Sequence, residues 1–158
     1  MTADGQTAYC VDINTNFESG YKNRVDAKDR MSDEQISDVA LNLEYVKQYA
    51  ATHSLSSKQV YLLEQCVVWH RLNVHLGWGY NNVRAAYDEV SEKIQSEVYE
   101  NAKAFAKANK DRYGCGGYIY VGDGQDLGKL WAKLAVSDGK IQKSSSNTAI
   151  ISARPTPR

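Results

Sequence analysis

Three cysteines, Cys10, Cys66 and Cys115, are the most nucleophilic side chains in this 158-residue chain. A thiolate attacks acyl carbons and binds metals near neutral pH. The sequence has no Cys-x-x-Cys pair, and its three histidines do not complete a zinc-finger spacing, so neither a metal site nor a cofactor is predicted. Because the cysteine count is odd, at least one sulfur is expected to have a role other than an intramolecular disulfide.

Gln65 is the second residue with chemical potential. It lies in residues 60–70, a stretch that is apolar on nearly all sides and therefore predicts a buried helix. A buried carboxamide left without hydrogen-bond partners costs about 1–3 kcal/mol. Gln65 is thus expected to be either well hydrogen-bonded or chemically active.

Local signals indicate three helices between the ends of the chain. Ser32 to Gln35 and Ser56 to Gln59 are capping boxes, which predict one helix over 33–52 and the start of a second at about residue 57. A third helix is predicted from Asn82, with Gly114 as its stop. Its apolar residues recur at helical spacing, namely Val83, Tyr87, Val90, Ile94, Val98, Ala102 and Phe105.

Strand signals flank these helices. Residues 8–13 predict a short strand with Cys10 near its end, followed by a polar loop, and residues 118–121 predict a second strand. Residues 125–136 fit a helix or a strand, and 149–152 predict a last strand. We expect an α+β domain over residues 1–154: a small β-sandwich or barrel-like sheet with an inserted helical subdomain at about 32–113. Residues 155–158 are expected to be a linker or the edge of an excised fragment.

Composition narrows the function classes. Nineteen basic residues balance nineteen acidic ones, which argues against a nucleic-acid partner. No apolar run approaches the roughly 20 residues that span a bilayer, and the first residues lack signal-peptide features, so no membrane insertion is expected. Eleven tyrosines against two phenylalanines favour a binding surface.

Two segments, residues 9–12 and 64–69, resemble the thioester domains at the tips of Gram-positive surface adhesins and pili. In that family an early cysteine in a Tyr-Cys-like context is joined to a glutamine in a Thr-Gln-x-Ala-x-Trp-like helical motif. Here Cys10 matches the cysteine, Gln65 the glutamine and Trp69 the closing aromatic position.

Downstream, residues 117–121 and 124–127 resemble the family's later strand and its Gln-Asp/Asn-Leu segment, so the resemblance covers most of the chain. Two residues depart from the motif: Glu64 replaces threonine and Val67 replaces alanine. The pocket around the glutamine is therefore expected to have a different shape.

The resemblance implies an internal thioester between Cys10 and Gln65. A lysine amine of another protein would displace the sulfur and become covalently attached. Tyr9, Trp69 and Trp78 are candidates for the wall that keeps water away, although each fits an ordinary core role as well. His70 is a candidate proton relay, but it lies about 140° around the helix from Gln65, which favours packing.

The resemblance also implies the biological setting. The expected protein is a single-turnover covalent binding module and not an enzyme, a monomer at the tip of a larger surface protein. Its partner would be a host surface or extracellular-matrix protein. Its location would be the bacterial cell surface, with signal peptide and wall anchor outside this sequence.

Two alternatives stay open. One is a Cys-His hydrolase or transglutaminase-like acyl transferase, with Cys10 as nucleophile and His70 or His75 as base. The other is a non-covalent interaction domain in which Gln65 is merely hydrogen-bonded. Once Cys10 is committed to another bond, Cys66 and Cys115 are a possible disulfide pair, which would account for the odd cysteine count.

Overall fold

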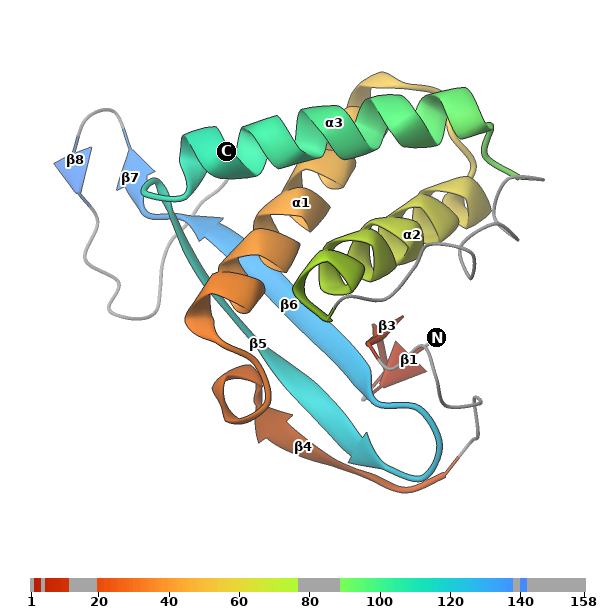
Figure 1. Ribbon diagram of the computed structural model, residues 1–158, viewed down its shortest axis with the longest axis vertical. Coiled ribbons are helices and arrows are strands. Elements are labelled where there is room, and N and C mark those ends of the chain that lie inside the picture. The colour runs from red at the N-terminus through yellow and green to blue at the C-terminus, as the bar shows by residue number, and fades with distance from the viewer. Residues whose placement is uncertain (1, 4, 12–19, 77–88, 138–139, 142–158) are drawn as a thin grey trace.

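The computed structural model describes residues 2–3, 5–11, 20–76, 89–137 and 140–141 (Figure 1). The helices are η1 (Ala27–Asp29), α1 (Asp33–Thr52), α2 (Ser57–Leu76) and α3 (Glu92–Asn109). The strands are β1 (Thr2–Ala3), β2 (Gln6–Thr7), β3 (Tyr9–Cys10), β4 (Lys22–Asp26), β5 (Tyr113–Gly122), β6 (Leu127–Leu134), β7 (Val136–Ser137) and β8 (Lys140–Ile141). The α+β class with helices inserted between strands is confirmed.

A four-stranded antiparallel sheet has the order β3-β6-β5-β4, so β3 near the N-terminus pairs with β6, the last long strand. Cys10 lies opposite Leu127, which lies opposite Tyr120, which lies opposite Arg24. These four residues therefore form one row across the sheet. In the described part of the chain this sheet is open, with β3 and β4 as its edges, and does not close into a barrel.

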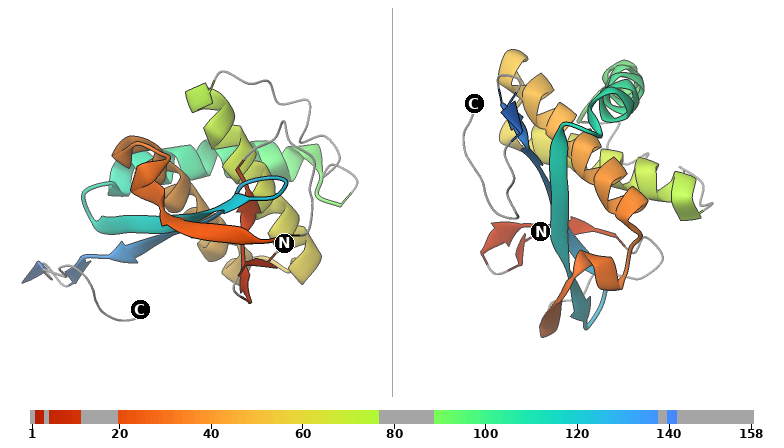
Figure 2. Two further views of the ribbon diagram at one scale, coloured as in Figure 1. Left: turned by 90° about the horizontal axis from the view of Figure 1, so that it is seen from below. Right: turned by 90° about the vertical axis from the view of Figure 1, so that its left-hand side faces the viewer.

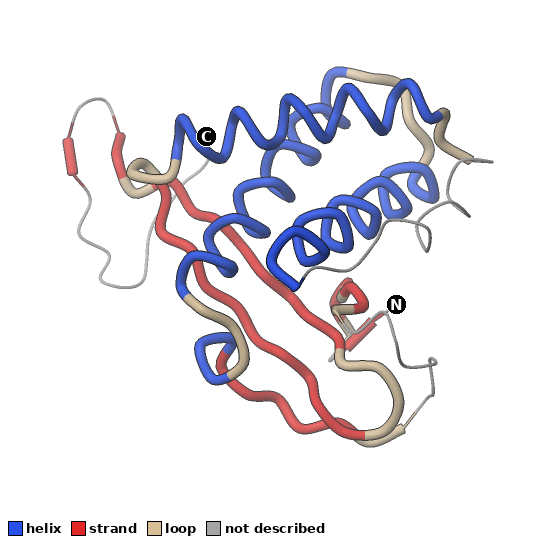
Figure 3. The backbone as a smooth tube through the Cα atoms, in the orientation of Figure 1, coloured by secondary structure: helices blue, strands red, loops and turns tan. Residues whose placement is uncertain are grey.

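Helices α1, α2 and α3 lie on one side of the four-stranded sheet (Figures 2 and 3). Helix α1 packs on β5 and β6, and α2 packs along the edge strand β3. The main core lies between α1 and the sheet, and a second core joins the three helices. A third, smaller cluster surrounds Cys10 and contains Ala8, Tyr120 and Leu127. None of the described helices is both long enough and apolar enough to cross a membrane.

The first two helices start where the capping boxes predict. The Ser32 side chain accepts from Gln35 N at 3.1 Å, and Ser56 Oγ accepts from Gln59 N at 3.1 Å. The third helix begins later than predicted, at Glu92, because Ser91 caps it by accepting from Ile94 N. Residues 82–88 of the prediction lie outside the described part.

Several strand boundaries also differ from the prediction. Gly114 does not stop a helix but lies in β5, which starts at Tyr113 because its ladder with β6 continues past the glycines. Residues 127–134 resolve the ambiguous segment as strand β6. Strand β4 is not predicted from the sequence. Its mostly polar residues suit a half-exposed edge of a sheet. The predicted strand at 149–152 and the expected linker lie outside the described residues.

Candidate functional site

The structure brings Cys10 and Gln65 together through two buried hydrogen bonds. The backbone N–H of Cys10 donates to Gln65 Oε1 at 2.8 Å, and Gln65 Nε2 donates to the Cys10 carbonyl oxygen at 3.0 Å. Cys10 is fully buried and Gln65 is 6% exposed. The carboxamide thus satisfies both backbone groups that the edge strand turns away from β6, as an additional strand would.

Two neighbouring contacts set the position of α2 along β3. Tyr9 Oη donates to Glu64 Oε1 at 2.8 Å, and Tyr61 Oη donates to the Ala8 carbonyl at 3.4 Å. The rings of Tyr9 and Tyr61 stack, with centroids 5.5 Å apart. The Tyr9–Glu64 and Cys10–Gln65 pairs have the same sequence separation of 55 residues. This equal spacing was a signal for the Tyr9–Glu64 link that sequence reasoning missed.

The cluster around Cys10 is apolar. Ala8, Tyr120 and Leu127 are each at most 5% exposed, and Trp69, one helical turn after Gln65, packs against them. Trp69 Nε1 is buried and has no hydrogen-bond acceptor among the described residues. Trp69 therefore packs against the cluster that contains Cys10.

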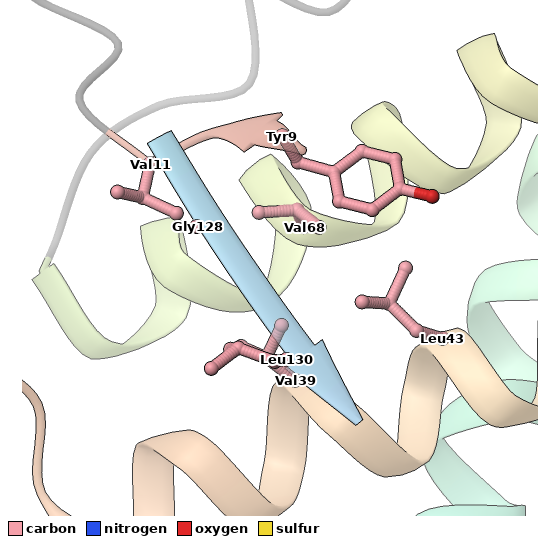
Figure 4. A pocket seen from close by; sticks show the side chains of 7 residues that line it. All are labelled: Tyr9, Val11, Val39, Leu43, Val68, Gly128 and Leu130. Carbon is pink, nitrogen blue, oxygen red and sulfur yellow. The ribbon is translucent and has the colours of Figure 1, made fainter. Parts of the chain in front are cut away.

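The opposite face of β3 packs against the helices. Tyr9 and Val11 meet apolar side chains of α1, α2 and β6, and the gap between them is too small for a water molecule (Figure 4). The side chains that line it are Tyr9, Val11, Val39, Leu43, Val68 and Leu130, together with Gly128. Tyr9 consequently supports β3 from the helix side, on the face opposite to Cys10.

Glu64 has an unusual electrostatic environment. Burial raises the pKa of its carboxyl, and the hydrogen bond from Tyr9 acts in the opposite direction and lowers that pKa. Burial and the nearby Glu64 charge raise the pKa of the Tyr9 hydroxyl. The glutamate in place of threonine thus gives this site a titratable group one residue from Gln65.

Cys66 and Cys115 are not joined by a disulfide. Cys66 packs with Leu62, Trp69 and Tyr99, whereas Cys115 packs in the core between α1 and the sheet. Burial raises the pKa of each thiol to about 11. Both are therefore poor nucleophiles at neutral pH.

His70 lies on another side of α2, where its ring stacks on Tyr99 with centroids 4.3 Å apart. Burial lowers the pKa of His70 to about 4, with a further contribution from Arg71. The imidazole is therefore neutral at pH 7 and packed against α3, which favours the packing role that its helical position predicts. Trp78 and the His75 side chain lie outside the described part. Within that part, no group of three or more His, Cys, Asp or Glu is placed to hold a metal ion.

The hydrogen bond to Gln65 Oε1 is of the kind that assists acyl transfer at a carbonyl. Attack by sulfur on Cδ moves negative charge onto Oε1, and that oxygen already accepts a hydrogen bond from the Cys10 N–H. The donor comes from a strand held by its neighbour and by α2, so it is oriented before the reaction.

Fold and site together define a class of protein. It is an α+β domain in which a cysteine on an edge strand is hydrogen-bonded to a glutamine on a helix. A family model described as the thioester domain matches residues 7–104, more than half of the chain, including both Cys10 and Gln65. The chain therefore belongs to the thioester domain family. No significant match was found to a curated protein or to a solved structure.

Proposed function

We propose that this protein is a covalent adhesion module, in which a Cys10–Gln65 thioester captures a lysine amine of another protein. The observation that carries the proposal is the pair of buried hydrogen bonds that holds the Gln65 carboxamide on the Cys10 backbone. Membership of the thioester domain family supports it.

In the first step, Cys10 Sγ attacks Gln65 Cδ. A C–S bond forms, the C–N bond to Nε2 breaks, and nitrogen leaves as ammonia with the proton from the thiol. The Cys10 N–H stabilises the charge on Oε1 during attack. Loss of Nε2 also removes the hydrogen bond to the Cys10 carbonyl, so the covalent bond replaces one of the two contacts.

In the second step, an amine nitrogen attacks the same carbon. A C–N bond forms, the C–S bond breaks, and a proton from the amine goes to the Cys10 sulfur. The product is an amide between Gln65 and the lysine, and Cys10 returns to a thiol. Each molecule reacts once, because the amide product blocks Gln65; the module is not a turnover enzyme.

The proposed setting follows the family resemblance. The partner is a host surface or extracellular-matrix protein with an accessible lysine. The module acts as a monomer at the tip of a larger protein on a Gram-positive cell surface.

Intact mass spectrometry tests the proposal. The freshly purified protein is expected to weigh less than its sequence by one ammonia. Treatment with methylamine is expected to add the mass of one methylamine to that species. A full sequence mass that methylamine leaves unchanged would contradict the proposal.

Variants assign the bond to its two residues. Cys10→Ala and Gln65→Ala are each expected to restore the full sequence mass and to abolish the adduct. Cys66→Ala is the matched control, because it removes a buried thiol next to Gln65 and should leave both mass changes intact. Repeated turnover of an ester or amide substrate would instead favour the hydrolase alternative.

A further inference from the structure

Helices α1, α2 and α3 lie against one face of the four-stranded sheet (Figure 2). By strand register, a group of aromatic and basic side chains from β4, β5 and β6 lies on the other face. Arg24 lies over the ring of Tyr118 at 4.4 Å, and Tyr118 meets Trp131 edge-on with centroids 5.5 Å apart. Lys129 and Lys133 flank Trp131, with ammonium groups 6.0 and 5.7 Å from its ring centre. We call these five residues the cationic strip.

The strip is a built surface and not a scatter of side chains. Its members come from β4, β5 and β6 and share one face by strand alternation and register. The Trp131 ring lies over Gly116, where an added Cβ would meet the ring at 3.4 Å. The three cations are already held against aromatic rings. Less side-chain conformational entropy is therefore lost when they form ion pairs with a partner.

The charged side chains on this face are mainly basic. Among the side chains of β4, β5 and β6 that point this way, Asp26 is the one carboxylate. Arg24 and Lys133 are exposed and Lys129 is partly exposed, whereas Lys22 is bound to the carbonyl oxygens of Asp123 and Gln125. Three cations therefore remain to meet a partner of opposite charge, although the whole chain is neutral.

The strip adjoins the proposed reaction centre. Cys10 and Leu127 lie opposite each other on this same face, and Tyr118 packs against the cluster that contains Cys10. Along β6, Trp131 is four residues from Leu127, a distance of about 13 Å. A partner segment that reaches Cys10 in extended form would cover this distance with about three to five residues.

We infer that the cationic strip docks an acidic, extended segment of the partner protein and thereby selects which lysine reacts. Aspartate or glutamate about three to five residues from the acceptor lysine would meet Arg24, Lys129 and Lys133 while the lysine enters beside Trp69. This inference rests on the proposed covalent reaction and adds the sequence preference of its acceptor.

Competition between two single-lysine peptides tests the inference. One peptide carries three acidic residues beginning three positions from the lysine, and the other carries glutamines there. Since several weak surface ion pairs add up, we expect the acidic peptide to form the adduct about tenfold faster at low salt, a difference of about 1.4 kcal/mol. The preference should fall as ionic strength rises.

Charge variants assign the preference to the strip. Lys133→Glu and Arg24→Gln are expected to reduce the acidic-peptide rate several-fold and to leave the methylamine rate unchanged. Lys107→Glu, an exposed change on α3, is the matched control and should not alter either rate. Equal rates for the two peptides would overturn the inference. Inhibition by heparin, together with equal rates for the two peptides, would also overturn it, because the strip would then bind an acidic glycan and not an acidic peptide segment.

The methylamine reaction separates the two proposals. If methylamine forms no adduct, the proposed function itself fails. If methylamine reacts but the acidic peptide has no advantage, the covalent function stands and the docking inference alone fails.

Discussion

The Tyr9–Glu64 hydrogen bond is expected to hold α2 against β3, and the change Tyr9→Phe removes it. The substitution keeps the ring, and with it the stacking on Tyr61, but deletes the hydroxyl that donates to Glu64 Oε1 at 2.8 Å. Hydrogen bonds to charged groups contribute about 1.5–3 kcal/mol. Because this pair is only part-buried, we expect the free energy of unfolding to fall by about 1–2 kcal/mol at pH 8.

The loss should depend on pH, with a sign set by Glu64. Burial raises the pKa of Glu64 in the folded protein, so this group destabilises the fold progressively as pH rises through that pKa. The Tyr9 hydroxyl lowers the pKa, so its removal raises the pKa further and increases the penalty of the ionised form. The loss of unfolding free energy caused by Tyr9→Phe is therefore expected to be larger at pH 8 than at pH 4, where Glu64 is protonated.

Urea unfolding followed by circular dichroism measures the effect. All variants carry Cys10→Ala, so that no covalent bond contributes to the difference. Tyr61→Phe is the matched control: its hydroxyl makes a longer hydrogen bond of 3.4 Å, and its loss should cost about 0.5 kcal/mol or less. Equal costs for the two variants, or a Tyr9→Phe cost that is the same at both pH values, would refute the reasoning.

Three further predictions concern buried polar groups. In the Cys10→Ala background, where no covalent bond forms, Gln65→Ala removes the carboxamide that pairs with the N–H and C=O of residue 10, so urea unfolding should show the free energy of unfolding falling by about 2–4 kcal/mol; a loss below 1 kcal/mol would be inconsistent with the docking described. Cys66 and Cys115, with pKa values of about 11, should react with iodoacetamide at pH 8 about 100-fold more slowly in the native than in the urea-unfolded protein, and equal rates would show that they are accessible thiolates. His70 has a folded pKa of about 4, below its ordinary value, so its contribution to stability is lost as pH falls from about 6.5 towards 4; an NMR titration midpoint above 6 would contradict this.

Local sequence determined where the first two helices begin. Ser32 with Gln35 and Ser56 with Gln59 satisfy the first free N–H groups of their own helices, and no distant residue is needed for that. The third helix begins at Glu92 and not at the predicted Asn82. Apolar periodicity indicates that a helix is present but not where it begins, whereas the N-cap Ser91 fixes its first residue.

Strand boundaries depended on the partner strand. The glycines at 114, 116 and 117 have low β-propensity, yet they lie in β5 because β6 pairs with each of them. Gly117 also admits the close approach of β6, since an added Cβ there would lie 2.3 Å from the Lys129 carbonyl oxygen. The same pairing decided that residues 127–134 form a strand, a choice that their apolar spacing left open.

The sequence by itself determined the two residue types needed for a thioester, and the family motifs pointed to Cys10 and Gln65. Only the tertiary structure decided that they meet. Strand β3 becomes an edge because it pairs with β6, more than 110 residues later, and an edge strand leaves one row of backbone groups unsatisfied. Helix α2 lies along that edge. The Gln65 carboxamide supplies the acceptor for the Cys10 N–H and the donor for the Cys10 carbonyl oxygen. That complementarity is long-range, so no local pattern in the chain contains it.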